Sequence, residues 1–129
     1  MLDAKLCLGM PVGRFIPDGR LHEIVEIARG AEAAGVDSVV VVDHVVMSDR
    51  LDRYTWGKFA FPDLTTPWPE PITTLAAIAG ATSRIRLATG IVIAALRAPA
   101  LFAKTIATLD VLSRGRVDLG VGTGWQKEE

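Results

Sequence analysis

His44 has the clearest capacity for chemistry in this sequence. It follows the apolar run Val39–Val42 and lies next to Asp43, so we expect a partly desolvated imidazole beside a carboxylate. An imidazole in that setting can donate or accept a proton near neutral pH. The alternative is a histidine that only hydrogen-bonds a neighbouring loop. A zinc site is less favoured, because the other histidine, His22, begins a surface helix and Cys7 is the single cysteine.

The run Thr89-Gly90-Ile91 is the second candidate, because a threonine and a glycine interrupt an otherwise aliphatic strand. A glycine weakens a strand and commonly marks a bulge or a place where a ligand approaches the backbone closely. The alternative is a glycine that only allows tight packing. Contact with a bound ligand and local packing therefore both stay open for this run.

The third candidate is Gly122-Thr123-Gly124, which follows Gly120 at the end of the fourth expected strand. The spacing invites comparison with the dinucleotide-binding fingerprint, but Trp125 stands where that fingerprint needs its third glycine. Glycines at a strand end still present bare backbone N–H groups, which can bind a phosphate or a ring carbonyl. The segment thus indicates a backbone contact to a cofactor rather than a Rossmann site.

A repeating strand–helix pattern positions these candidates. Short apolar runs predict strands over residues 5–12, 37–46, 86–93 and 116–121. Apolar residues at helical spacing predict helices that begin near Leu21, Pro71 and Pro99, with Gly35 and Gly115 ending the first and the third. In parallel α/β folds the working groups lie at the carboxyl ends of the strands. If the sheet curls into a barrel, the three candidates therefore lie together at the end of the barrel formed by the carboxyl ends of the strands, which we call its mouth.

The number of strand–helix units indicates the fold. A complete (β/α)8 barrel needs roughly 250 residues, so four strands and three helices are about half of one. We therefore expect an α/β fold in which residues 1–129 form a single domain, the N-terminal half of a TIM barrel. Open apolar edges on the first and fourth strands are a liability for a free-standing domain. We expect a fragment, a truncated gene product or one member of an assembly, either a homo-oligomer or a pairing of open sheet edges.

The connection from Val46 to Pro69 is longer than most loops of compact domains. It contains several aromatic residues, which argue against plain disorder: Tyr54, Trp56, Phe59, Phe61 and Trp68. Because the connection follows a strand, it leaves the sheet at the same edge as His44. We expect it to form a lid, and the alternative is an inert insertion.

The composition and charge of the chain argue against several classes of binding partner. A formal net charge of −1 provides no basic surface for nucleic acid or for an anionic membrane. No apolar run approaches the roughly 20 residues of a membrane span, and no signal-peptide pattern is present. Cys7 cannot form an internal disulfide, and we expect it to be a buried strand residue. The expectation is a cytoplasmic protein that acts on a small organic substrate, without a metal.

Several segments together resemble the luciferase-like monooxygenase family, in particular its coenzyme F420-dependent branch. The segments are Val39–Val46, Ser83–Ile91, Pro99–Lys104, Leu109–Arg116 and Leu119–Trp125. The resemblance covers the whole chain except the loop over residues 46–69. It implies a (β/α)8 barrel with the cofactor ring lying in the mouth of the barrel.

The resemblance also implies roles for the candidate residues. His44 matches the active-site histidine of the family, close to the reactive carbon and the substrate, and Asp43 matches its neighbour. The run Thr89–Ile91 matches a bulged strand that backs the ring, where the resemblance implies a non-proline cis peptide at Gly90–Ile91. The run Gly122–Gly124 matches the strand end that lines the polar side of the ring.

Three functions follow from these observations. The first is an oxidoreductase that moves hydride between an organic substrate and coenzyme F420, with His44 as acid–base group or as substrate polariser. The second is an FMN-dependent monooxygenase that uses oxygen, and the pair Asp43–His44 favours the deazaflavin over it. The third is a catalytically inactive half-barrel fragment that needs a partner chain, because the family draws much of its phosphate and ribityl binding from the other half of the barrel. In both enzymes the cofactor supplies the redox chemistry and the protein orients it.

Overall fold

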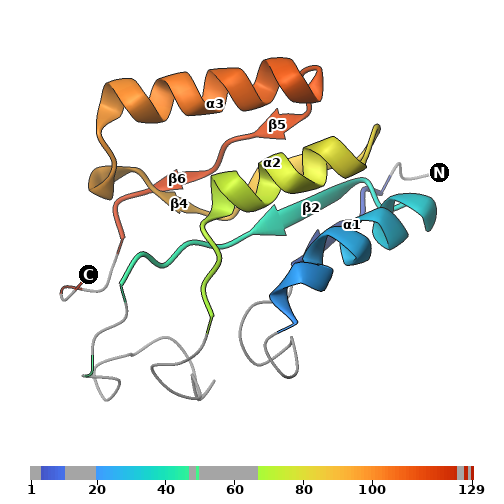
Figure 1. The fold of residues 1–129 in the computed structure, drawn as a ribbon, viewed down its shortest axis with the longest axis horizontal. Coiled ribbons are helices and arrows are strands. Elements are labelled where there is room, and N and C mark those ends of the chain that lie inside the picture. The colour runs from blue at the N-terminus through green and yellow to red at the C-terminus, as the bar shows by residue number, and fades with distance from the viewer. Residues whose placement is uncertain (1–3, 11–19, 47–48, 50–66, 125–126, 128) are drawn as a thin grey trace.

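The structure, a computed structural model, describes residues 4–10, 20–46, 49, 67–124, 127 and 129. Strands and helices alternate along the chain, as predicted (Figure 1). The elements are β1 (Cys7–Gly9), the 3-10 helix η3 (Leu21–Glu23), α1 (Ile24–Ala33), β2 (Ser38–Val41), α2 (Pro71–Ala81), β3 (Arg86–Thr89), β4 (Val92–Ile93), the 3-10 helix η5 (Ala94–Leu96), α3 (Pro99–Ser113), β5 (Val117–Asp118) and β6 (Val121–Gly122).

The strands form a parallel sheet in chain order. The main sheet has the order β1-β2-β3-β5, and β4 pairs with β6 in a second sheet of two parallel strands. One row of side chains crosses the main sheet in register, from Leu8 through Val39 and Leu87 to Val117. Neighbouring parallel strands need a crossover connection, and α1, α2 and α3 provide it. The predicted α/β fold class is confirmed.

The third and fourth strands are each divided in two, whereas the sequence predicted continuous strands over 86–93 and 116–121. Between β3 and β4 lies a cis peptide bond, Gly90–Ile91, at the predicted position. Beside it the Thr89 hydroxyl donates to the carbonyl oxygen of Gly120 at 2.7 Å and accepts from the Gly120 N–H at 2.9 Å. A side chain thus replaces the backbone ladder at this point, which is why the pairing of β3 with β5 stops and resumes between β4 and β6. The first two strands are also shorter than predicted.

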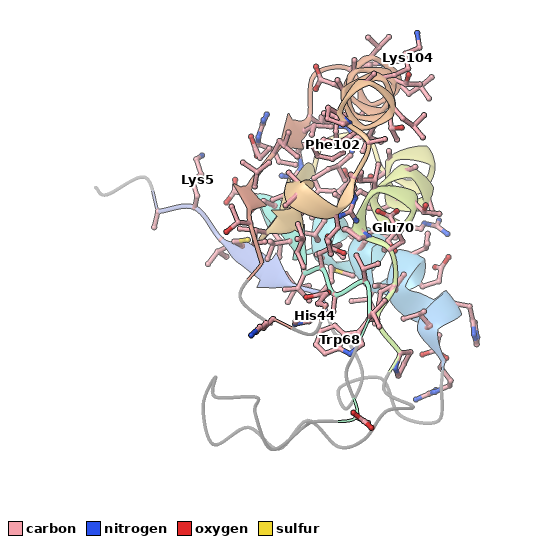
Figure 2. The ribbon with its side chains drawn as sticks, turned by 90° about the vertical axis from the view of Figure 1, so that its left-hand side faces the viewer. Lys5, His44, Trp68, Glu70, Phe102 and Lys104 are labelled. Carbon is pink, nitrogen blue, oxygen red and sulfur yellow. The ribbon has the colours of Figure 1, made fainter. Side chains whose placement is uncertain are left out.

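The three α-helices cover one side of the strands, and the core lies between the two layers (Figure 2). The sheet contributes side chains such as Val39, Val41 and Leu87, which are 0% exposed. α2 contributes Leu75 and Ile78, also 0% exposed. Burial of such aliphatic side chains is the main stabilising contribution of a layer packing of this kind.

The opposite side of the sheet is open, which corrects two expectations. The run 39–42 has no polar alternation, which predicts a strand buried on both faces, but burial alternates along β2, with Ser38 and Val40 only half-buried. Cys7 lies in a strand as expected but is exposed, because it points away from the helices. Further along this face Arg86 and Asp118 form an exposed ion pair at 2.5 Å. Only the helix-covered face of the strands is therefore a dry core.

α3 buries a narrower stripe than its sequence predicts. Leu109 is 4% exposed and Phe102 and Ile106 pack against the core. The helical spacing of Leu101 and Leu112 in the sequence predicts that they belong to the same stripe, but they are 69% and 74% exposed. They line a groove of about 600 Å³ between α2 and α3 instead.

Arg116 binds carbonyl groups at the ends of α2 and α3 and at the residue just before β3. Its guanidinium donates to the carbonyl oxygens of Ala79, Thr82, Ile85 and Ser113 and to the Thr82 hydroxyl, at 2.8–3.1 Å. Arg116 is 9% exposed, and its burial lowers the pKa of the guanidinium. The carbonyl groups at a helix C-terminus carry partial negative charge, so they stabilise the buried cation.

Glu32, near the end of α1, holds the turn before β3. Its carboxylate accepts hydrogen bonds from the backbone N–H groups of Ser83, Arg84 and Ile85, at 2.5–3.0 Å for Oε1. Burial opposes its ionisation, but these three donors outweigh burial and lower the pKa of Glu32. The helical spacing of the sequence predicts a solvent position for Glu32, and the structure connects it instead to the turn before β3.

Two expectations concern residues that the structure does not describe. One is the N-cap that Asp18, just before the helix predicted to begin near Leu21, offers to that helix. The expected lid is the other, because its residues 50–66 lie outside the described residues and Trp68 is the aromatic residue of that connection that is described. Among the described residues, no helix is long and apolar enough to cross a membrane.

Candidate active site

His44 lies just beyond the carboxyl end of β2 and beside Trp68 (Figure 2). Glu129 completes this small cluster. Nδ1 of His44 is 3.3 Å from Oε2 of Glu129, and the side chains of the two residues are 8% and 3% exposed. The indole of Trp68 meets the imidazole edge-on, with ring centroids 4.6 Å apart and planes at 70°. The imidazole is therefore desolvated and has a carboxylate beside it, as the sequence predicted. The carboxylate, however, is Glu129.

Glu129 is the group that sequence reasoning missed. Its second oxygen, Oε1, accepts a hydrogen bond from the backbone N–H of Val45 at 2.5 Å. The carboxylate thus joins the segment after β6 to the segment after β2, across 85 positions of sequence. No local pattern predicts such a contact. The available signal was topological, because the carboxyl ends of parallel strands share one edge and bring the following segments together.

Asp43 serves a different network. It is 7% exposed, and its Oδ2 accepts hydrogen bonds from the Ile93 N–H at 2.8 Å and from Arg97 Nη1 at 2.6 Å. Arg97 also donates to the Ile93 carbonyl oxygen and to Oε1 of Glu70. The adjacent residues Asp43 and His44 therefore use their side chains in two separate networks, one that holds β4 and one at the mouth.

The Arg97 network connects the strand ends to the first turn of α2. Glu70 caps that helix, because its Oε2 accepts a hydrogen bond from the Thr73 N–H at 2.7 Å. Burial opposes the charge of Arg97, but hydrogen bonds to Asp43 and Glu70 outweigh it and raise the pKa of the guanidinium. Burial likewise opposes ionisation of Glu70, and the donors from Thr73 and Arg97 lower its pKa. Arg97 and Glu70 both keep their charge, which fits a structural rather than a proton-transferring role.

The predicted cofactor residues on the other strands fall into two groups. The hydroxyl of Thr89 is engaged with the backbone of Gly120, and Gly90 is needed because a Cβ there would lie 2.5 Å from Cγ2 of Val40. Ile91 is different, since it is 38% exposed and covers Gly122, where a Cβ would lie 2.8 Å from its Cδ1. The packing alternative thus explains Thr89 and Gly90, and the contact of both with a cofactor stays a prediction.

The residues that follow β6, Thr123 and Gly124, are the third predicted part of the site. Gly124 has φ +81°, a left-handed conformation that side chains disfavour, and Thr123 is exposed with its hydroxyl on the Gly124 carbonyl oxygen at 3.3 Å. Val121, just before, is 55% exposed. An exposed Ile91 and Val121, bare glycine backbone and a desolvated His44 at one edge of the sheet are the donor and apolar set that suits a flat ring with polar edges.

The groove between α2 and α3 lies elsewhere. It is lined mainly by apolar and small side chains of the helical layer, such as Ile72, Ala76, Leu101, Phe102 and Leu112. His44 and the strand ends are not among its lining residues. Glu70 and Arg97 are among its lining residues, so the groove borders the Arg97 network but not the His44 cluster.

The fold and the site define a class, a partial parallel α/β barrel with its polar groups at the carboxyl edge. Residues 8–129 match the model of the luciferase-like monooxygenase family. The chain belongs to this family, as the resemblance implied.

Known proteins of the family give the match more detail. The chain is 40% identical over 104 residues to an F420-dependent glucose-6-phosphate dehydrogenase of Segniliparus rotundus, covering 80% of this chain and 27% of that enzyme. The crystal structure of a monooxygenase of Streptomyces bottropensis matches with a TM-score of 0.72 and 29% identity, covering 97% of this chain and 35% of the other. An F420-dependent secondary alcohol dehydrogenase in complex with an F420–acetone adduct matches with a TM-score of 0.69 and 25% identity, covering 93% and 32%. The chain thus spans about a third of the length of each of them.

Proposed function

We propose that this chain forms the histidine-bearing part of the active site of an oxidoreductase that moves hydride between an organic substrate and coenzyme F420. The observation that carries the proposal is the desolvated His44, held at the carboxyl edge of the sheet by Glu129 and Trp68. The names of two similar proteins support the choice of cofactor, since both are F420-dependent dehydrogenases. F420, when bound, supplies the carbon that accepts or releases the hydride.

In this proposal Ile91, Val121 and the glycine backbone at Gly122 and Gly124 hold the ring. Ile91 and Val121 offer exposed apolar surface to a ring face. The backbone at the two glycines, which carry no side chain of their own, offers donors to polar ring edges. The assignments of Asp43, Thr89, Gly90 and Thr123 are indirect, because these residues shape the strand ends that carry the contacts.

His44 handles the proton in this proposal. When a carbon that bears a hydroxyl is oxidised, two electrons and one hydrogen leave as hydride, and the hydroxyl proton must go elsewhere. Nδ1 of His44 faces Glu129, so we assign the proton to Nε2, the second ring nitrogen. In the reverse direction Nε2 returns the proton to the carbonyl oxygen. A positioned group of this kind contributes about 10²- to 10⁴-fold to the rate.

A cofactor titration of the intact protein tests this function. We expect ring fluorescence of F420 to be quenched on binding, and FMN to bind weakly or not at all. In His44→Gln we expect F420 binding within about twofold of the wild type and hydride transfer slower by about 10²-fold or more. Tight binding of FMN without binding of F420 would overturn the proposal in favour of the FMN-dependent monooxygenase, which the family description and the Streptomyces bottropensis monooxygenase support.

A second candidate function follows from the open side of the sheet. Side chains such as Cys7, Arg86 and Asp118 are exposed on the face that the described helices do not cover, and β1 and β5 are edges of the described sheet. We propose that further strands pair with these edges, from the same protein or from another copy, and that these 129 residues alone have no catalysis. Size-exclusion chromatography with light scattering and a turnover assay tests it. A stable monomer of these residues with full turnover would contradict it.

A further inference from the structure

Glu129 makes two contacts of different kinds with the segment after β2. One oxygen accepts a hydrogen bond from the Val45 backbone N–H at 2.5 Å, and the other lies 3.3 Å from Nδ1 of His44. Its side chain is 3% exposed and that of His44 is 8% exposed, so both contacts are largely shielded from water. A backbone N–H is always a donor, and this fixes one oxygen of Glu129 as an acceptor.

The second oxygen determines which ring nitrogen carries hydrogen. An ionised carboxylate only accepts hydrogen bonds, so the Nδ1 that faces it must carry the hydrogen. In the neutral imidazole the other nitrogen, Nε2, then has the lone pair, and in the protonated ring Nε2 is a donor. A histidine that acts as a base needs its lone pair on the nitrogen that faces the substrate. A carboxylate that accepts from Nδ1–H meets this need, because it leaves the lone pair on Nε2.

We propose that Glu129 is the positioning residue of the active site, which selects the Nδ1–H tautomer of His44 and so directs Nε2 at the substrate. This inference rests on the proposed function for the role of Nε2, but the tautomer itself does not depend on any cofactor. Trp68 completes the arrangement, because its edge-on contact at 70° limits rotation of the imidazole about its own bond.

Asp43, the acidic residue next to His44 in sequence, cannot take this role in the present arrangement. The oxygen Oδ2 of Asp43 accepts from both Ile93 and Arg97, and this ion pair is buried at 2% and 15% side-chain exposure. Turning the carboxylate toward the imidazole would leave the Arg97 charge without its closest partner, at a considerable cost.

The substitution Glu129→Gln gives the inference a distinctive signature. The Val45 N–H still needs an acceptor, so the amide oxygen of Gln stays on Val45. The amide NH2 group then faces Nδ1, and because it is a donor, Nδ1 must become the acceptor. We therefore expect this nearly isosteric change to invert the tautomer to Nε2–H, whereas loss of the side chain in Glu129→Ala leaves both tautomers accessible.

The experiment is nitrogen-15 NMR of histidine side chains in the intact protein, without cofactor and at a pH where the ring is neutral, with His44 assigned by its absence in His44→Gln. We expect Nδ1–H in the wild type, Nε2–H in Glu129→Gln and a mixture in Glu129→Ala. The matched control is Glu26→Gln, since Glu26 is exposed and pairs with Arg29 on the surface of α1, and we expect it to leave the signal unchanged. An Nε2–H tautomer in the wild type overturns the inference even if no variant folds.

Kinetics separate the inference from the proposed function. With F420 and substrate we expect Glu129→Gln to lower kcat for oxidation by about 10²-fold while F420 affinity stays within about twofold, because the ring remains but Nε2 already carries a hydrogen and cannot accept the proton. A tautomer that inverts while kcat is unchanged would overturn the positioning role. If the protein does not bind F420 at all, the proposed function fails, but the NMR result still decides the tautomer.

Discussion

Asp43 and Arg97 form a buried ion pair, with Oδ2 and Nη1 2.6 Å apart and side-chain exposures of 2% and 15%. Removal of one member leaves the other charge buried without its closest partner, which typically costs about 3–5 kcal/mol. We expect Asp43→Asn to lower the free energy of unfolding by roughly that amount, measured by urea denaturation. We expect the double variant Asp43→Asn with Arg97→Gln to lose much less than the sum of the two single variants. Additive losses would show that the pair does not act as a unit.

Arg116 should not tolerate replacement by lysine. Its planar guanidinium reaches five acceptors, at two helix ends and on Ile85 just before β3, and an ammonium group offers three donors from one point. We expect Arg116→Lys to lower the free energy of unfolding by about 2–4 kcal/mol, because buried carbonyl groups lose their donors. Arg29→Lys is the control, since Arg29 is exposed on α1, and its stability should change by less than about 0.5 kcal/mol. Equal effects of the two changes would contradict this account.

Stability should fall as the solution is made acidic. Burial opposes ionisation of Glu32, but the backbone donors of residues 83–85 outweigh it and hold the pKa below the ordinary value of 4.5. A carboxylate with a lowered folded-state pKa contributes stability above the unfolded value, and this contribution is lost as pH falls from about 4.5 through the folded value. We expect Glu32→Gln to be less stable than the wild type at pH 7 and to show a flatter decline below pH 4.5, in urea midpoints measured against pH. The same steepness in both proteins would show that Glu32 does not contribute.

Gly122 should be sensitive to a single methyl group at the site. A Cβ at this position would lie 2.8 Å from Cδ1 of Ile91, so the isoleucine must move away from it. If Ile91 supports the cofactor ring, we expect Gly122→Ala to weaken F420 binding by about tenfold, which equals about 1.4 kcal/mol. Gly30→Ala is a matched control, because nothing lies within 4 Å of its Cβ and it is in the interior of α1. We expect this control to keep its F420 affinity and to gain about 0.5–1 kcal/mol in stability.

Periodicity alone was sufficient to predict the α/β fold and the three helices. The places where it failed have identifiable physical causes. Strand breaks at Gly90–Ile91 and after Asp118 depend on a side-chain-to-backbone exchange between Thr89 and Gly120, which lie 31 positions apart. The exposure of Leu101 and Leu112 depends on how far α3 is rotated toward α2, and apolar spacing does not determine this.

The sequence was sufficient to predict where the site lies, but not which side chains form hydrogen bonds with each other in it. The position of His44 after an apolar strand was sufficient to predict its burial. Sequence adjacency suggested Asp43 as its carboxylate partner, but neighbouring residues at a strand end point to opposite faces. The actual partner, Glu129, follows another strand and is identified only once the order of the strands is known.

Arg97 has a consequence for how the site responds to change. Through Asp43, Ile93 and Glu70 it fastens the end of β2, the backbone of β4 and the first turn of α2 to one guanidinium. The segment that carries the imidazole is therefore braced against the outer layer of the molecule. One guanidinium therefore ties three elements that are far apart in the sequence, so loss of Arg97 would release the first turn of α2, the end of β2 and the backbone of β4 together.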